Sequence, residues 1–267
     1  MKLSKHLVEK PWGRTDIPAE FGEMGGRRIG EIWYEGDDGA DLPILVKWLF
    51  TSEKLSIQVH PDDAQAQARG LPSGKEECWY IIDAEPDAVL GMGTKRPLDA
   101  DELRAASLSG EIEQLMEWKP VKAGDYFYIP AGTVHAIGAG ITLVEVQQYA
   151  DITYRLYDYG RPRELHLDDG VSVSNAKPYD DARSGKASGN MTLVNGPHFW
   201  LSHICTQPGL DSLPQDVQIW VVPLEGKVEC SDGEVGVGDC MVVESAKKIT
   251  VRTGSRVLIA ASKRLQL

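Results

Sequence analysis

The sequence predicts a mainly β protein with a few short helices. Three observations lead to this fold class: short apolar or alternating segments dominate, glycine and proline separate them at close intervals, and helical periodicity is confined to two stretches. A chain of 267 residues, of which 42% are hydrophobic, is long enough for one large β domain or two smaller ones.

The clearest strand signals lie in the first 150 residues. Residues 43–50 (PILVKWLF) are almost continuously apolar, which indicates a buried strand. Residues 54–60 alternate, so the apolar side chains face one side while Ser56, Gln58 and His60 face the other. Further short strands are expected at 79–82, 126–129 and 141–146.

Two helices are expected. Asp62 caps a short helix that ends at Gly70. A longer helix is predicted over residues 99–118, where Asp99 and Glu102 resemble a capping box. The apolar face of this second helix consists of Leu108, Ile112, Leu115 and Met116.

Composition excludes several classes of partner. The formal net charge of −12 repels nucleic acid and anionic lipid, and no run of about 18 apolar residues is present to span a membrane. The first residues lack the apolar region of a signal peptide, and the four cysteines form no CxxC pair, so we expect a cytoplasmic protein with reduced thiols. An anionic substrate would need a local cationic pocket.

The strongest motif is GDYFYIPAGTVH at residues 124–135. Its glycine, proline, glycine and histidine predict a turn, a strand, a tight corner and a histidine that faces into the fold. The spacing resembles the second conserved motif of the cupins, although Ala139 stands where that motif often has asparagine. The resemblance implies a jelly-roll β-barrel.

A second set of residues can join His135. Gln58 and His60 are two apart on a predicted strand and so point to the same face, and Glu77 follows in GKEECWY. Two imidazoles, one carboxylate and one amide oxygen suit zinc or another divalent first-row metal. A dication with one anionic ligand keeps a positive charge that can stabilise an oxyanion on a substrate.

Four segments together resemble type I mannose-6-phosphate isomerases in their short bacterial form. They are SIQVHP (56–61), GKEECWY (74–80), PAGTVHAI (130–137) and VEVQQYADITYRLYDYGR (144–161). The resemblance covers roughly residues 10–170. It implies a metal-dependent isomerase that interconverts mannose 6-phosphate and fructose 6-phosphate through a cis-enediol.

The resemblance also implies roles for individual residues. Lys75 matches the family's active-site lysine, Arg155 matches its catalytic arginine, and Glu145 lies ten residues before Arg155 as in the family. Glu76 is expected to point to the opposite face of its strand from Glu77. The implied ligands of one Zn²⁺ per chain, or of another divalent first-row metal, are Gln58, His60, Glu77 and His135.

Other assignments stay open. Glu145 and Arg155 share one surface if the strand between them is unbroken, and a buried lysine without a role, as at Lys47, is uncommon. The general base is Glu145, Lys75 or a hydroxide on the metal. Substrate contacts are expected from Lys47, Ser56 and Arg161, with the phosphate anchor open among Lys47, Lys75, Arg155 and Arg161.

The second half of the chain carries no such motif. Residues 175–190 are rich in Asn, Asp, Ser, Gly and Lys and predict a linker. Residues 191–267 return to short strands but lack the ligand histidines and the corner proline. We therefore expect a metal-binding cupin domain over 1–174 and a degenerate, metal-free cupin-like domain over 191–267.

Two alternative functions are a cupin non-haem iron dioxygenase and a non-catalytic sugar-phosphate-binding cupin. Two histidines and a carboxylate also form the facial triad of iron oxygenases. Gln58 as a fourth ligand argues against the first alternative, and Arg155 beside a complete ligand set argues against the second. A monomer and a homodimer are both compatible with the sequence.

Overall fold

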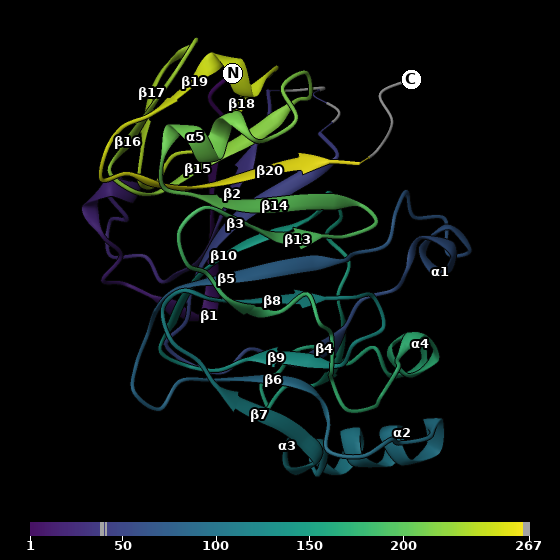
Figure 1. The fold of residues 1–267 in the computed structure, drawn as a ribbon. Coiled ribbons are helices and arrows are strands. Elements are labelled where there is room, and N and C mark those ends of the chain that lie inside the picture. Colours follow the sequence, from purple (N-terminus) through teal and green to yellow (C-terminus); the bar gives the residue numbers. More distant parts are fainter. Residues whose placement is uncertain (38–39, 41, 264–267) are drawn as a thin grey trace.

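The computed structural model describes residues 1–37, 40 and 42–263 (Figure 1). Its named strands pair antiparallel in four sheets, which are stacked with a group of helices at one end. The predicted mainly β class with a few short helices is confirmed. Among the helices of the described residues, none combines the length and apolar character that a membrane span requires.

The first sheet lies in the middle of the stack and has seven strands. In spatial order they are β1 (Ser4–Arg14), β2 (Ile29–Glu35), β3 (Ile44–Phe50), β10 (Ile141–Gln148), β5 (Glu77–Ala84), β8 (Asp125–Ile129) and β12 (Gly185–Lys186). All seven residues of β3 are buried, as its apolar sequence predicts, because other layers cover both faces of this sheet.

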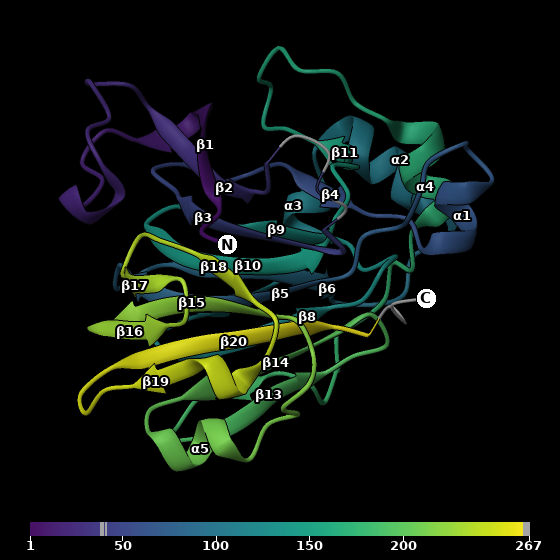
Figure 2. The ribbon, with the colours of Figure 1, turned by 90° about the horizontal axis from the view of Figure 1, so that it is seen from above.

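The second sheet covers one face of the first. Its spatial order is β11 (Tyr154–Tyr157), β4 (Ile57–Val59), β9 (His135–Ile137), β6 (Val89–Thr94) and β7 (Met116–Pro120). Trp79 and Leu143 of the first sheet pack against Leu90 and Met92 of the second. Short helices gather beside and outside the second sheet (Figure 2): α1 (Asp63–Gln67), α2 (Ala100–Ser109), α3 (Ile112–Leu115) and α4 (Leu167–Val173).

The third sheet covers the opposite face of the first, and the fourth sheet packs against the other side of the third. The third contains β13 (Met191–Asn195), β14 (Phe199–Ile204), β20 (Arg256–Ser262), β15 (Ile219–Glu225) and β18 (Met241–Val243). The fourth contains β17 (Gly233–Gly236), β16 (Lys227–Cys230) and β19 (Ile249–Val251). The remaining helical elements are α5 (Gln207–Asp211) and the short 3-10 helices η1 (Ala19–Phe21) and η2 (Ala246–Lys248).

One continuous core joins the first and third sheets. Trp48 of β3 belongs to the same buried cluster as Phe199 of β14 and Trp220 of β15. The N-terminus extends this contact, because the amide of Leu3 donates to the carbonyl of Cys240 over 2.9 Å. The two halves of the chain therefore share an apolar interior, and backbone hydrogen bonds at its edge add to the contact.

Both predicted helix N-termini are confirmed. The Asp62 carboxylate accepts the backbone N–H of Gln65 at the start of α1, and the Asp99 carboxylate accepts that of Glu102 at the start of α2. In each case the side chain three residues on returns a hydrogen bond to the capping backbone, which completes a capping box. Helix α1 ends at Gln67, slightly before the predicted Gly70.

The predicted single helix over 99–118 is wrong. Helix α2 ends at Gly110, whose φ of 81° is left-handed and terminates a helix at little cost because glycine has no Cβ. A short α3 follows, and from Met116 the chain pairs with β6 as strand β7. Leu108, assigned to the apolar face, is 66% exposed.

Candidate metal centre and active site

Adjacent strands of the first sheet point charged side chains toward the second sheet. Lys47 on β3 lies directly opposite Glu145 on β10, and Gln147 on β10 lies opposite Glu77 on β5. Side chains alternate along a strand, so these odd-numbered residues share one face while the even-numbered residues enter the core beside the third sheet. The alternation thus places Lys47, Glu77 and Glu145 on the face of the first sheet that borders the second sheet.

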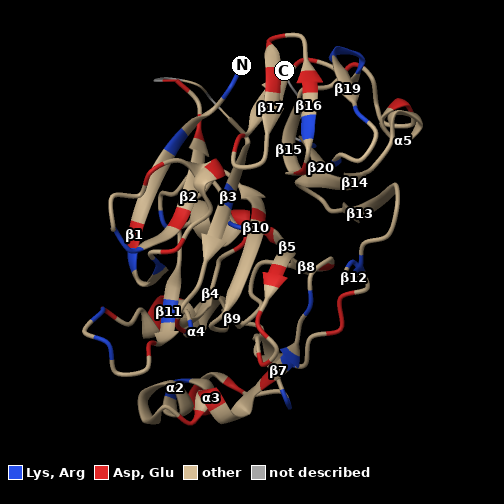
Figure 3. Cartoon of the chain, turned by 90° about the vertical axis from the view of Figure 1, so that its left-hand side faces the viewer, with Lys and Arg blue, Asp and Glu red and all other residues tan. Residues whose placement is uncertain are grey.

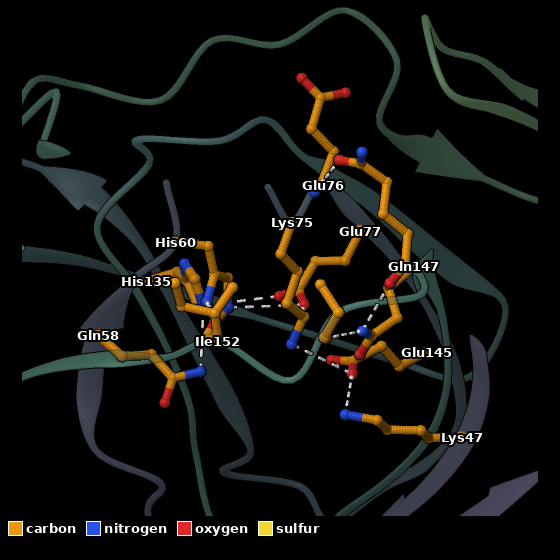
Figure 4. Close-up of polar contacts among 12 residues, drawn as sticks. Lys47, Gln58, His60, Lys75, Glu76, Glu77, His135, Glu145, Gln147 and Ile152 are labelled. Carbon is orange, nitrogen blue, oxygen red and sulfur yellow. Dashed lines mark hydrogen bonds and ion pairs between the residues drawn. The ribbon is translucent and has the colours of Figure 1, made fainter. Parts of the chain in front are cut away.

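The second sheet supplies the opposite wall. Gln58 on β4 pairs with His135 on β9 on one side and with Arg155 on β11 on the other. His60 follows β4, and Lys75 precedes β5. The side chains of Gln58, His60, Lys75 and His135 converge with those of Glu77 and Glu145 between the two sheets (Figure 4).

Three of these residues form a compact group. Among the described residues, His60, Glu77 and His135 are the one set of at least three His, Cys, Asp or Glu whose candidate ligand atoms all lie within 4.8 Å of one another. The Nε2 of His60 is 3.7 Å from Glu77 Oε2, and the Nε2 of His135 is 3.5 Å from Glu77 Oε1. All three side chains are buried.

Backbone carbonyls orient both imidazoles. The Nδ1 of His60 is 2.6 Å from the carbonyl oxygen of Ile152, and the Nδ1 of His135 is 2.8 Å from that of Thr133. A carbonyl can only accept, so each Nδ1–H donates and each Nε2 carries a lone pair toward Glu77. Burial lowers the pKa of both rings, that of His135 to about 4, which favours the neutral form that binds metals.

The polar atoms at the centre of the group fit a divalent cation. His60 Nε2 and Glu77 Oε1 are buried without a hydrogen bond, an arrangement that is costly unless a cation supplies the missing contact. The amide Nε2 of Gln58 is 3.3 Å from His135 Nε2. Rotation of that amide by half a turn would present its oxygen, the atom that ligates metals.

A row of alternating carboxylates and lysines leads away from the two histidines. Its members, in order, are Glu77, Lys75, Glu145, Lys47 and Glu31. The Nζ of Lys75 is 2.9 Å from Glu77 Oε2 and 3.6 Å from Glu145 Oε1. The Nζ of Lys47 is 3.4 Å from Glu145 Oε1 and 3.8 Å from Glu31 Oε2. Each buried lysine therefore lies between two carboxylates, which offsets the cost of burying its charge.

Neighbouring charges in this row set the pKa values of Glu145 and Lys75. Burial alone would raise the pKa of Glu145, but Lys75 and Lys47 outweigh it and hold the pKa well below its ordinary value. Burial likewise opposes the charge on Lys75, yet Glu145 and Glu77 raise its pKa above the usual range. At neutral pH, Glu145 is therefore a carboxylate and Lys75 an ammonium.

The row opens onto a cavity of about 300 Å³. Five cationic side chains and three carboxylates line it, so its walls carry a positive excess although the chain carries −12. Many other acidic residues lie on outer elements, including the α2–α3 region (Figure 3). The lining charges are Lys10, Lys47, Lys75, Arg155 and Arg163 against Glu31, Glu145 and Asp151.

Most of the predicted site residues meet at this cavity. The predicted site residues that line it are Lys47, Ser56, Gln58, Lys75, Glu145 and Arg155. Arg161 is not among the lining residues, and its guanidinium instead contacts Asp158 and the carbonyl of Lys54. The carboxylate of Glu76 points away from Glu77, toward the hydroxyl of Tyr128.

The unbroken strand expected from Glu145 to Arg155 does not exist. Strand β10 ends at Gln148 in the first sheet, and β11 begins at Tyr154 in the second. The buried amide of Gln147 donates to the carbonyls of Gln148 and Ala150, which holds the crossover between the sheets. Glu145 and Arg155 still line one cavity, but from opposite walls rather than from one strand face.

Several cavity residues escaped the sequence analysis. Lys10 and Glu31 lie on β1 and β2, where charged residues alternating with apolar ones look like a solvated strand face. Arg163 and His166 follow β11 in a segment without periodicity. One available signal was Glu31 in GEIWYE, because it alternates with apolar neighbours on a strand that is otherwise mostly buried.

Comparison with known proteins identifies the family. No family model matches the sequence. A mannose-6-phosphate isomerase of Streptococcus mutans, however, is 44% identical across 74% of this chain and 76% of its own length. The chain belongs to the mannose-6-phosphate isomerase family. A second member, from Bacillus subtilis, is 41% identical across 62% of this chain and 64% of its own length.

Solved structures agree with this family assignment. The crystal structure of the mannose 6-phosphate isomerase from Bacillus subtilis superposes with a TM-score of 0.79 at 28% identity, covering 97% of this chain and 98% of that one. A putative mannosephosphate isomerase from Archaeoglobus fulgidus shares the fold, with a TM-score of 0.76 at 18% identity over 98% of this chain and 97% of its own. The isomerase family fold thus includes the third and fourth sheets.

His203 on β14 and His198, directly before β14, do not line the cavity. The ring of His203 stacks on Tyr80, and His198 lies 3.8 Å from Asp63 and 3.9 Å from Glu76. We expect the double variant His198→Ala, His203→Ala to keep its metal content and turnover near wild type, with some loss of stability because His203 is buried. Metal analysis and steady-state kinetics check this. A double variant without metal would show that the metal binds in the second half of the chain and not at His60, Glu77 and His135.

Proposed function

We propose that this chain is a zinc-dependent isomerase that interconverts mannose 6-phosphate and fructose 6-phosphate. One observation carries the proposal. The buried group His60, Glu77 and His135 adjoins a cavity with a positive excess of lining charge, in a member of the mannose-6-phosphate isomerase family. A metal group beside a cationic cavity suits a substrate that is both polyhydroxylated and anionic.

In this proposal His60, Glu77 and His135 hold one Zn²⁺, with the amide oxygen of Gln58 as a fourth ligand. Nitrogen and oxygen ligands of this kind suit zinc and related divalent first-row metals. When bound, the ion supplies a positive charge that stabilises negative charge on substrate oxygens. The carbonyl partners of the imidazole Nδ1 atoms keep both rings in the ligating orientation.

The remaining charged residues divide into two functions. Lys47 and Lys75 are each held between carboxylates, whereas Arg155 and Arg163 lie on the other wall of the cavity. We assign the phosphate to Arg163, because a planar guanidinium group matches its geometry, and leave Arg155 to the reacting oxygens. Lys47 and Ser56 then contact the sugar, and Arg161 acts through the segment that it holds.

Proton transfer between the two sugar carbons falls to Glu145. It is buried, ionised, and oriented by the indole N–H of Trp79, which donates to Oε2 over 3.0 Å. In the proposed reaction Glu145 takes the proton from one carbon of the open-chain sugar and returns it to the neighbouring carbon of the cis-enediol, while the hydroxyl proton of the first carbon passes to the carbonyl oxygen of the second. The Lys75 ammonium and the Arg155 guanidinium stabilise the negative oxygens that develop between these steps.

We also propose that the chain has a cupin architecture. The first and second sheets enclose the cavity, and we propose that residues 1–174 form the metal-binding jelly-roll with 175–190 as linker. Residues 191–267 form a degenerate, metal-free cupin-like domain with a packing role. The cysteines at 78, 205, 230 and 240 are all free thiols, which supports a reducing cytoplasmic location.

A coupled assay tests the function. We expect the purified chain to convert mannose 6-phosphate into fructose 6-phosphate with a turnover of about 1–10³ s⁻¹, measured by coupling the product to NADPH formation. A chelator should abolish this activity, and Zn²⁺ should restore it. Oxygen consumption by iron-loaded protein without isomerisation would instead support the dioxygenase alternative.

A further inference from the structure

Behind the arginine side of the cavity lies a buried carboxylate that bonds two arginines. Asp158 directly follows β11, and its side chain is buried. Arg163 donates from Nε to Asp158 Oδ2 over 2.6 Å and from Nη2 to Oδ1 over 2.7 Å. Arg161 donates from Nη2 to Oδ1 over 2.6 Å. One carboxylate therefore fixes both guanidinium groups.

The chain between these residues makes a turn of uncommon backbone conformation. Tyr159 has a φ of 55° and Gly160 a φ of 77°, and the amide of Arg161 donates to the carbonyl of Asp158 over 3.0 Å. A bulky residue rarely adopts positive φ, and such conformations persist only where surrounding contacts impose them. The bonds from Asp158 to the two arginines span this turn and supply those contacts.

The two arginines differ in what else they touch. The Nη2 of Arg161 donates to the carbonyl of Lys54 over 2.8 Å, which ties the turn to the segment before β4. Arg163 instead lines the cavity together with Arg155. After burial, the charge of Arg163 is the largest influence that lowers the pKa of Arg155, and the carboxylate of Asp158 opposes it. The two cavity guanidinium groups therefore repel each other, and Asp158 offsets that repulsion.

We propose that Asp158 is a positioning residue for the phosphate of the substrate. It holds the guanidinium of Arg163 in the cavity wall beside Arg155, where Arg163 can bind the phosphate. The two-point contact with Asp158 uses Nε and one N–H of Nη2, so the Nη1 donors of Arg163 are left to a ligand. This inference rests on the proposed function, because it assigns the anionic end of the same cavity.

The test is Asp158→Asn in the zinc-loaded full chain. The variant keeps the size of the side chain but loses the charge that holds two guanidinium groups. We expect the KM for mannose 6-phosphate to rise about 10- to 100-fold, with kcat changed by less than about threefold. The affinity for inorganic phosphate, measured by calorimetry and as competitive inhibition, should fall by the same factor. The matched control is Asp168→Asn, a carboxylate that is 93% exposed and pairs with Arg104.

A double variant shows whether Asp158 acts through Arg163. Phosphate affinity in Asp158→Asn, Arg163→Ala should equal that of Arg163→Ala alone, since there is no guanidinium left to position. A much weaker double variant would overturn the inference. So would unchanged phosphate affinity in Asp158→Asn accompanied only by a lower Tm, since that is the signature of a structural role.

If Asp158→Asn does not fold, Arg163→Lys keeps the cavity charge but loses the two-point contact with Asp158, and unchanged phosphate affinity in that variant would refute the role of Asp158. If the wild-type chain binds phosphate without isomerising mannose 6-phosphate, the proposed function fails. The phosphate titrations still decide the inference about Asp158 in that case.

Discussion

Replacing His135 by alanine should remove both the metal and the isomerase activity. His135 is buried on β9, and its Nε2 faces Glu77 while its Nδ1 is held by the carbonyl of Thr133. Loss of a partner outside the ligand shell already costs about 10- to 100-fold in metal affinity, so loss of a ligand should cost more. We expect metal content to fall from one ion per chain to a small fraction and turnover to fall below detection.

Metal analysis after dialysis and the coupled assay measure this effect. The matched control is His6→Ala, because His6 lies on β1 with its side chain 56% exposed and contacts Glu35 and Trp33 rather than the metal group. Circular dichroism should show a folded β protein for both variants, since removing one imidazole from a core of this size creates only a local cavity. Full metal occupancy with wild-type turnover in His135→Ala would refute the assigned metal group.

Local sequence rules account for the elements whose signals are complete within a few residues. The alternation around Gln58, the apolar run of β3 and the capping boxes at Asp62 and Asp99 all appear where predicted. Each depends on neighbours in sequence, such as a side chain three residues from a backbone amide. The fold class followed from the number and spacing of such segments.

The errors arise where tertiary pairing overrides the local pattern. Residues 99–118 combine a capping box with a helical apolar face from Leu108 to Met116, yet the partner strand β6 draws Met116 and its successors into the second sheet. Gly110 was a stop signal within that pattern, with φ of 81°. The break after Gln148 likewise depends on two sheets that exist only in the folded chain, so alternation alone could not reveal it.

The candidate metal group was more predictable than the rest of the cavity. His60, Glu77 and His135 lie in motifs with fixed spacing, and a buried site needs those residue types. Arg163 and Glu31 enter the cavity from elements that carry no such motif. A basic or acidic residue in an irregular segment resembles ordinary surface until packing shows which cavity it faces.

The buried row of charges indicates a site selected for chemistry. Lys47, Lys75, Glu77 and Glu145 are all buried, and desolvating such groups costs more than burying apolar ones of similar size. Ion pairs between 2.9 and 3.6 Å offset part of that cost. An apolar interior would be simpler for a β fold, so the row is best explained by a need for fixed charges beside a substrate.

The second large effect is expected at Arg155. Its backbone pairs with Gln58, and its Nε donates to the carbonyl of Glu164 over 2.9 Å, which orients the guanidinium at the cavity. If Arg155 stabilises charge that exists mainly in the transition state, its removal should lower kcat much more than it weakens substrate binding. Loss of one preorganised donor to an oxyanion typically costs about 10²–10³ in rate.

Steady-state kinetics of Arg155→Ala and Arg155→Lys distinguish catalysis from anchoring. Arg155→Lys keeps the charge but loses the planar fork, so it should recover only part of the lost turnover. Arg163→Ala is the contrast, because loss of a phosphate contact should mainly raise KM. Metal content should stay at one ion per chain in all three variants, since neither arginine is a proposed ligand. Normal kcat with only a raised KM in Arg155→Ala would assign Arg155 to phosphate binding and leave Lys75 and the metal as the groups that stabilise the enediolate.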